Sequence, residues 1–267
     1  MKITCRALTH RGVVRRRNED AILVEGWVRA APMGAAREFC FDGPPFLAAV
    51  ADGLGGHNRG DIASTLALSR LAVLEGLAVP DEGSLGSALE TVHEELTELA
   101  SSSAEFRGMA TTIAGIALLE DRALLFNAGD SRIYRREGEH LQRLSVDDRP
   151  ACVGAGEDAM DQATNVVLQC LGGERGPQQL VPHFMSVDLA EHETFLLCTD
   201  GLHDVVNLHD MEAALLDAEA DPQADPVLAL LNRALEAGAP DNVTILLVRI
   251  ENTPGDPETT LPRSPES

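Results

Sequence analysis

The most informative stretch of this sequence reads FLAAVADGLGG and spans residues 46–56. Its first six residues are apolar, and an apolar run of this length is typical of a buried strand. Asp52 comes directly after the run, beside a turn rich in glycine. A carboxylate in this position is predicted to lie at the rim of a sheet and to point away from the core.

Three more aspartates stand where apolar runs begin or end. Asp130 follows residues 123–129, Asp200 follows residues 195–199, and Asp241 comes just before residues 242–248. With the Asn18-Glu19-Asp20 cluster near the N-terminus, they form a set of oxygen ligands suited to hard cations. Ligands of this kind favour magnesium or manganese, whereas zinc would favour histidine or cysteine.

Each of these motifs also has a simpler interpretation. Asp52-Gly53 alone is most often a plain turn, and Asp241 could form an Asx turn before a strand. Asp130 could be paired locally with Arg132, and the basic turn at residues 11–17 could be a solvated surface. The joint pattern favours a metal site, because ordinary turns do not require the same acid beside so many apolar runs.

The composition limits the possible partners. The chain has 267 residues and a formal net charge of −22. Phosphate backbones and anionic membrane surfaces both attract clustered cations, so neither nucleic acid nor a membrane is an expected partner. An acidic enzyme can still act on phosphate when bound metal ions supply local positive charge.

The five cysteines are irregularly spaced and include no Cys-x-x-Cys pair. This pattern argues against a disulfide framework and against structural zinc, and it favours a reducing cytoplasm. The N-terminus lacks an apolar signal core. No stretch approaches the roughly 18 apolar residues that span a membrane, so we expect a soluble protein.

Alternating blocks of strands and helices predict one α+β domain over residues 1–250, with an antiparallel sheet favoured. The expected strands cover residues 3–9, 20–28, 46–52, 110–119, 122–128, 131–136, 139–143, 165–170, 180–187, 193–199 and 242–250, and the expected helices cover residues 61–77, 84–101, 209–218 and 225–236. Ser84 is the predicted N-cap of the second helix. Residues 29–45 read as a loop or ragged hairpin, residues 145–164 as a functional loop, and residues 251–267 as a disordered tail.

Five motifs in this order make the sequence resemble the metal-dependent serine/threonine protein phosphatases of the PPM (type 2C) family, bacterial type. They are Arg15-x-x-Asn18-Glu19-Asp20, Ala51-Asp52-Gly53-x-Gly55-Gly56-His57, Gly129-Asp130-Ser131-Arg132, Thr199-Asp200-Gly201-Leu202 and Asp241-Asn242-Val243-Thr244. The resemblance covers about residues 3–250. It implies a four-layer αββα sandwich, in which two antiparallel β-sheets are flanked by helix pairs and the metals lie at one end.

The resemblance also implies a role for each site residue. The implied catalytic residues are Arg15, which would bind the substrate phosphate, and Asp52, which would bridge two Mn²⁺ or Mg²⁺ ions. The implied metal ligands are Glu19, Asp20, Asp52, Gly53, Asp130, Asp200 and Asp241. Asp200 and Asp241 would complete one ion and the Gly53 carbonyl the other, Glu19 would act through water, and Asp130 would hold a third, weaker ion. Residues 145–164 would form the flap beside the site.

The implied reaction is hydrolysis of phosphoserine and phosphothreonine in proteins by a metal-activated water. The implied partners are a Hanks-type Ser/Thr kinase and its substrates, and the protein is predicted to be a monomer. Leu54 stands where animal relatives carry a histidine that would protonate the leaving group, which leaves a metal-bound water or His57 for this role. His10 stands where many bacterial relatives have an acid.

Two alternatives stay open on the sequence. The first is a catalytically silent binding module that keeps the fold to sense a phosphorylated partner. The second is an enzyme with another substrate, either a small phosphate ester or a phosphorylated anti-sigma-factor antagonist. The complete ligand set favours an enzyme over the binding module.

Overall fold

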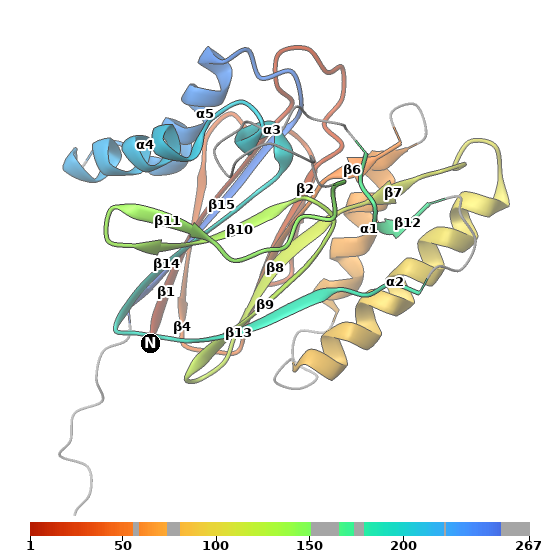
Figure 1. Cartoon of the computed structure of the whole chain (residues 1–267), viewed down its shortest axis with the longest axis horizontal. Helices are drawn as coiled ribbons and strands as arrows, with labels where there is room; N and C mark the ends of the chain where they lie inside the picture. Colours follow the sequence, from red (N-terminus) through yellow and green to blue (C-terminus); the bar gives the residue numbers. More distant parts are fainter. Residues whose placement is uncertain (56–58, 74–80, 151–165, 174–178, 222, 252–267) are drawn as a thin grey trace, which may run out of the picture.

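The computed structural model describes residues 1–55, 59–73, 81–150, 166–173, 179–221 and 223–251. Two six-stranded sheets pack face to face at the centre. The helices α1 (Gly60–Ala72) and α2 (Glu82–Ser102) cover one sheet, and α4 (Leu208–Ala220) and α5 (Pro226–Glu236) cover the other (Figure 1). All strand pairs in the described residues are antiparallel. The predicted four-layer α+β sandwich is therefore confirmed.

The first sheet has the strand order β11-β10-β14-β15-β1-β4, and the second has the order β13-β9-β8-β5-β2-β3. The first comprises β1 (Lys2–His10), β4 (Arg37–Asp42), β10 (Arg132–Glu137), β11 (His140–Arg143), β14 (His192–Cys198) and β15 (Val243–Glu251). The second comprises β2 (Ala21–Val24), β3 (Trp27–Arg29), β5 (Phe46–Ala51), β8 (Ile113–Leu118), β9 (Arg122–Ala128) and β13 (His183–Asp188). A small third sheet joins β6 (Gly53–Leu54), β7 (Ala110–Thr111) and β12 (Leu171–Gly172).

The helices are α1 (Gly60–Ala72), α2 (Glu82–Ser102), α3 (Asp200–His203), α4 (Leu208–Ala220) and α5 (Pro226–Glu236). The predicted helix pairs are confirmed. The predicted N-cap is wrong by three residues, because α2 begins after Asp81. The Asp81 carboxylate accepts the Ser84 backbone N–H, and the Ser84 hydroxyl accepts the Asp81 N–H, so the two residues form a capping box.

The strand β5 explains why the run at residues 46–51 contains no polar residue. Successive side chains of a strand point to opposite faces of the sheet. Leu47, Ala49 and Ala51 face the core beneath α1 and α2, and the alternate residues face the core between the two sheets. Both faces of β5 are buried, so both must be apolar. This burial fixes the end of the strand, where Asp52 follows, at one end of the sandwich.

Several expectations about secondary structure differ from the structure. The single strand expected at residues 20–28 is a hairpin of two strands, β2 and β3. The segment expected to be a loop contains the edge strand β4, in which the half-buried Phe39 and Phe41 alternate with exposed neighbours. The strand expected at residues 165–170 is absent from the described part of that range, and β12 follows it instead. The short helix α3, which begins at Asp200, was not predicted because four residues give no helical periodicity.

Several expectations fall on residues outside the described part of the chain. These are His57, the last part of the predicted first helix, residues 151–164 of the predicted flap, and residues 252–267 of the predicted tail. Glu251, the first residue of the predicted tail, is the last residue of β15. Within the described residues, no helix has the length and apolarity needed to cross a membrane.

Candidate metal centre

The strand registers bring the motifs that carry the aspartates to one end of the sandwich. Ala21 pairs with Ala51 in the second sheet, so the residues just outside this pair, Asp20 and Asp52, are neighbours. In the first sheet Cys198 pairs with both Arg132 and Ile245. The segments that carry Asp130, Asp200 and Asp241 therefore leave or enter that sheet at the same end of its strands.

The central member of this group is Asp52. Burial raises the pKa of its carboxyl group well above the usual range, and the negative charges of Asp200, Asp20, Asp241 and Asp130 raise it further. A like charge disfavours ionisation only when it lies close by. The five aspartates therefore form one electrostatic cluster.

Asp20 is the most deeply buried acid of the cluster and joins the two sheets. Its Oδ2 atom accepts hydrogen bonds from the hydroxyls of Thr244, at 2.6 Å, and Thr199, at 2.9 Å, both from the first sheet's side. Burial raises the pKa of Asp20 to about 7, although the two threonine hydrogen bonds oppose the rise. Its Oδ1 atom has no hydrogen-bond partner.

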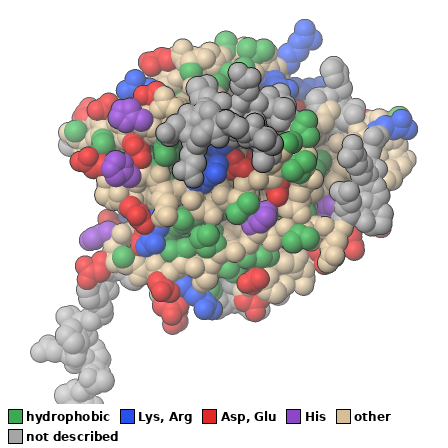
Figure 2. Space-filling model, viewed as in Figure 1, with side chains coloured by type: hydrophobic (Ala, Val, Ile, Leu, Met, Phe, Trp, Pro, Cys, Tyr) green, Lys and Arg blue, Asp and Glu red, His purple; other side chains and the backbone are tan. Residues whose placement is uncertain are grey.

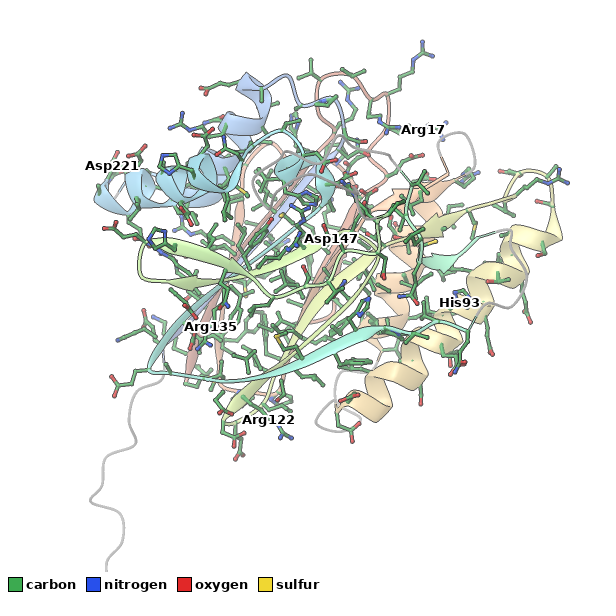
Figure 3. The ribbon with its side chains drawn as sticks, viewed as in Figure 1. Arg17, His93, Arg122, Arg135, Asp147 and Asp221 are labelled. Carbon is green, nitrogen blue, oxygen red and sulfur yellow. The ribbon has the colours of Figure 1, made fainter. Side chains whose placement is uncertain are left out.

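Arg15 lies on the basic loop between β1 and β2, with its side chain 44% exposed. Its Nη2 atom donates to Asp241 Oδ2 at 2.6 Å, and this hydrogen bond raises the arginine pKa. Figure 3 shows Arg17, from the same loop, and Arg122 at opposite ends of the sandwich. The loop therefore presents its charge at the end that carries the aspartates.

Asn242 fixes this loop in place. Its amide nitrogen donates to the carbonyls of Arg11, at 2.8 Å, and Arg17, at 2.9 Å, and its Oδ1 accepts the Glu19 backbone N–H at 2.8 Å. One buried side chain thus closes both ends of the loop that carries Arg15. The pKa of the half-buried Glu19 is raised, mainly by burial and then by the charge of Asp61.

A second arginine, Arg149, enters the cluster from the segment after β11. Its Nε donates to Asp130 Oδ2 at 2.5 Å, and its terminal nitrogens lie 3.0 and 3.1 Å from Asp204 and 3.4 Å from Asp200. Arg132, which the sequence suggested as the partner of Asp130, instead binds Asp147 at 2.6 Å. That suggestion was wrong because Arg132 is the first residue of β10, and its side chain points to the segment after β11.

Glycine is required beside two of the aspartates because backbones approach closely there. A Cβ atom at Gly53 would lie 2.3 Å from the Gly60 carbonyl oxygen, and one at Gly201 would lie 1.8 Å from the Asn242 oxygen. Neither glycine needs a positive φ, so space alone selects it. The Asp-Gly pairs therefore pack the acids against the neighbouring segments.

The donor set fits divalent cations such as Mn²⁺ and Mg²⁺. Buried carboxylate oxygens normally have partners, yet the Oδ1 atoms of Asp20, Asp130 and Asp200 have none. Oxygen ligands and closely spaced negative charge suit hard cations. Within the described residues no three acidic, histidine or cysteine side chains are arranged to chelate one ion. Arg15 binds the Oδ2 atom of Asp241, and Arg149 binds those of Asp130 and Asp200.

Most of the acidic excess lies elsewhere. Asp and Glu side chains are spread over the visible face of the molecule rather than gathered at one place (Figure 2). The cluster is distinguished by burial and not by the number of acids.

The sequence reasoning missed several residues of the centre. Thr199 and Thr244 are two of them, and the one signal for them in the sequence is their place in the Asp200 and Asp241 motifs: Thr199 directly precedes Asp200, and Thr244 follows Asp241 by three residues. Asp204 directly follows the short helix α3 and Arg149 lies in an irregular segment, and in neither place does a periodicity mark the direction of a side chain. The predicted candidates Arg15, Glu19, Asp20, Asp52, Gly53, Asp130, Asp200 and Asp241 all lie at this end of the sandwich.

Comparisons with known proteins agree with this arrangement. A sequence model described as "Protein phosphatase 2C" matches residues 39–237. The chain is 30% identical to the serine/threonine phosphatase stp of Listeria monocytogenes, with 92% of this chain and 95% of that protein covered.

Two solved structures are similar over nearly their whole length. The crystal structure of the Mycobacterium tuberculosis serine/threonine phosphatase PstP/Ppp is 27% identical and matches with a TM-score of 0.74, covering 94% of this chain and 100% of that one. The catalytic domain of PstP in complex with two manganese ions is 26% identical, with a TM-score of 0.73 and the same coverage. The chain therefore belongs to the protein phosphatase 2C family of serine/threonine protein phosphatases.

Proposed function

We propose that this enzyme removes phosphate from phosphoserine and phosphothreonine in proteins, using two Mn²⁺ or Mg²⁺ ions held by its aspartate cluster. The observation that carries the proposal is the placement of an exposed arginine, Arg15, which binds Asp241, at the end of the sandwich that holds buried carboxylates with unpartnered oxygens. Those carboxylates belong to Asp20, Asp130 and Asp200. The cations bound by the acids and the guanidinium group of Arg15 would both attract a phosphate group. The manganese complex of the related PstP domain supports the choice of metal.

The residues that would hold the two ions follow from the cluster. Asp52 is at its electrostatic centre and would serve both ions. Asp200 and Asp241 would serve one ion, the Gly53 carbonyl the other, and Glu19 would act through water. Asp20 is buried against two threonines with one oxygen free, so it would orient this end of the cluster. When bound, the ions supply positive charge and activate water for attack on phosphorus.

Arg15 would bind and orient the phosphate. A guanidinium group has five N–H donors, and the bond to Asp241 engages only one nitrogen of Arg15. The remaining donors can form a planar fork with phosphate oxygens. Because Asn242 fixes both ends of the loop, this fork is held in position before the substrate arrives.

The chain's own nucleophiles do not compete with water. Cys198, which directly precedes Thr199, is fully buried, and burial raises the pKa of its thiol to about 12. A neutral buried thiol is a poor nucleophile. Leu54 has no proton to give to the leaving serine or threonine oxygen, so we propose that water near the phosphate supplies it.

The biological setting is part of the proposal. Phosphorylated proteins, among them a Hanks-type kinase and its substrates, are the proposed partners. The enzyme is proposed to act as a monomer in the cytoplasm, which suits the free thiols of Cys5, Cys40, Cys170 and Cys198.

The test is manganese-dependent hydrolysis of p-nitrophenyl phosphate and of phosphoserine peptides by the full chain. The Asp52→Asn and Asp200→Asn variants should lose at least about 100-fold in kcat. The matched control is Asp121→Asn, which changes an exposed aspartate and should leave kcat unchanged. Full activity in excess EDTA would refute the proposal.

Two further measurements separate the alternatives. A binding module would hold a phosphopeptide without turnover, so calorimetry showing peptide binding but no manganese binding would favour it. An enzyme for small esters would hydrolyse them with higher kcat/KM than any phosphopeptide. Profiling both substrate classes, including a phosphorylated anti-sigma-factor antagonist, therefore decides the substrate.

A further inference from the structure

Arg149 is the least exposed cation at the metal centre. Its side chain is 8% exposed and faces the carboxylates of Asp130, Asp200 and Asp204, which are 4%, 20% and 25% exposed. The guanidinium meets Asp204 through two nitrogens, at 3.0 and 3.1 Å, in the fork geometry that arginine forms with carboxylates. Its third nitrogen, Nε, takes Asp130 Oδ2 at 2.5 Å.

This arrangement balances charge that would otherwise be costly. Removing one partner of a buried ion pair leaves an uncompensated charge. Burial alone would raise the pKa of Asp204, but hydrogen bonds from His203 and Arg149 hold it at about 2. Arg149 therefore acts as the counter-ion of a three-carboxylate pocket that lies beside the proposed pair of metal ions.

We propose that Arg149 is a built-in cation that takes the place of the third metal ion at Asp130, so that the chain binds two metal ions rather than three. The inference rests on the proposed function, because it concerns the same aspartates. It replaces the expectation that Asp130 would hold a third, weaker ion.

The contacts explain how Arg149 can exclude a third ion and spare the other two. It engages the Oδ2 atoms of Asp130 and Asp200, whereas their Oδ1 atoms have no partner. Asp200 therefore keeps an oxygen for the proposed pair. A third ion at Asp130 would have to displace the guanidinium or lie in contact with it. The positive charges of the ion and of the guanidinium would then repel each other. Arginine stays charged at any working pH, so deprotonation cannot open the site.

The removal of the guanidinium should create the missing ion site. Arg149→Met keeps an apolar stem of similar length and leaves Asp130, Asp200 and Asp204 without a counter-ion. Three carboxylates that face one pocket then form an oxygen site for a hard cation. We expect the third manganese ion to bind at least about tenfold more tightly to this variant than to the natural chain.

The experiment is calorimetric titration of the EDTA-stripped full chain with manganese chloride. The natural chain should bind two ions, Arg149→Met three, and the control Arg143→Met two, since Arg143 is exposed and contacts Asp147 instead. A second readout is thermal unfolding in EDTA, where Arg149→Met should melt at a lower temperature than the natural chain and gain more from added manganese.

A variant in the natural background tests the inference even if Arg149→Met does not fold. Asp130→Asn should leave the number of bound ions at two, because Arg149 already occupies the pocket. A natural chain that binds three ions, one of them lost in Asp130→Asn, would overturn the role of Arg149 but not the proposed function. An equal ion count in the natural chain and Arg149→Met would do the same. The absence of manganese from every variant would refute the proposed function and this inference together.

Discussion

Replacing Asn242 with alanine should weaken both the fold and the phosphate site. The change removes three hydrogen bonds, two to the carbonyls of Arg11 and Arg17 and one from the Glu19 backbone N–H. Asn242 is 4% exposed, so its partners are poorly placed to find water. At about 0.5–1.5 kcal/mol for each of the three bonds, the free energy of unfolding should fall by about 1.5–4.5 kcal/mol. A chain of this size should then melt roughly 5–15 °C lower.

The same change should impair catalysis because Arg15 lies on the released loop. A loop free to move by an ångström misplaces the guanidinium relative to the phosphate, and misplacement on that scale can cost about 100-fold. We therefore expect kcat/KM for a phosphopeptide to fall by about 10- to 100-fold with manganese saturating. The metal affinity should change less, because Asp52 and Asp200 do not depend on this loop.

The measurements are urea unfolding, followed by the fluorescence of the single tryptophan, Trp27, and steady-state kinetics. The matched control is Asn207→Ala, which removes the exposed N-cap of α4. It should cost about 1 kcal/mol and leave kcat/KM unchanged. If Asn242→Ala unfolds within about 1 kcal/mol of the natural chain and keeps kcat/KM within about twofold, Asn242 does not hold the loop.

Three further predictions follow from the aspartate cluster. The pKa values of Asp20 and Asp200 are raised to about 7 and about 6, against roughly 3.9 in the unfolded chain, so the folded state keeps protons that the unfolded state loses. Without metal, stability should fall as the pH rises from about 4 to about 7, and urea midpoints in EDTA that rise over this window would contradict it. Thr244→Val removes a hydrogen bond to Asp20 and should cost about 1–3 kcal/mol and weaken manganese binding, while an unchanged calorimetric affinity would speak against that role. Gly201→Ala should cost more than about 3 kcal/mol because its Cβ would meet the Asn242 oxygen at 1.8 Å, whereas Gly34→Ala, with nothing within 4 Å, should be neutral in the same urea titration.

The sequence predicts best those strands and helices whose hydrophobic pattern repeats along a buried surface. β5 and β15 read as strands because both of their faces are buried. The edge strand β4 was read as a loop because only two of its six residues, Phe39 and Phe41, turn aromatic side chains toward the core, and Gly43 and the prolines follow at once. An edge strand gains less from burial, so its sequence is less constrained.

The candidate site was predictable for residues fixed by strand ends and poorly predictable for residues that reach it across space. Asp52 lies at a position set by β5, so the sequence shows where it goes. Arg149 comes to Asp130 from nineteen positions away, through a segment whose path no period describes. Arg132 lies closer to Asp130 in the sequence, yet it binds Asp147 instead. The direction in which the strand points a side chain, and not the distance along the sequence, decides which carboxylate that side chain can reach.

The pKa directions indicate why metal binding and folding should be one equilibrium in this enzyme. Burial holds Asp20, Asp52 and Asp200 in a state that favours protons, which is a cost once the pH exceeds their pKa values. The proposed divalent ions would replace those protons and satisfy the oxygens that the fold leaves without partners. Binding should therefore release protons near neutral pH and raise the melting temperature in proportion to the logarithm of the metal concentration. Arg149 limits this dependence, because it pairs with Asp130 Oδ2 and with both carboxylate oxygens of Asp204 without any metal, so part of the acid cluster keeps its counter-ion when the ions are gone.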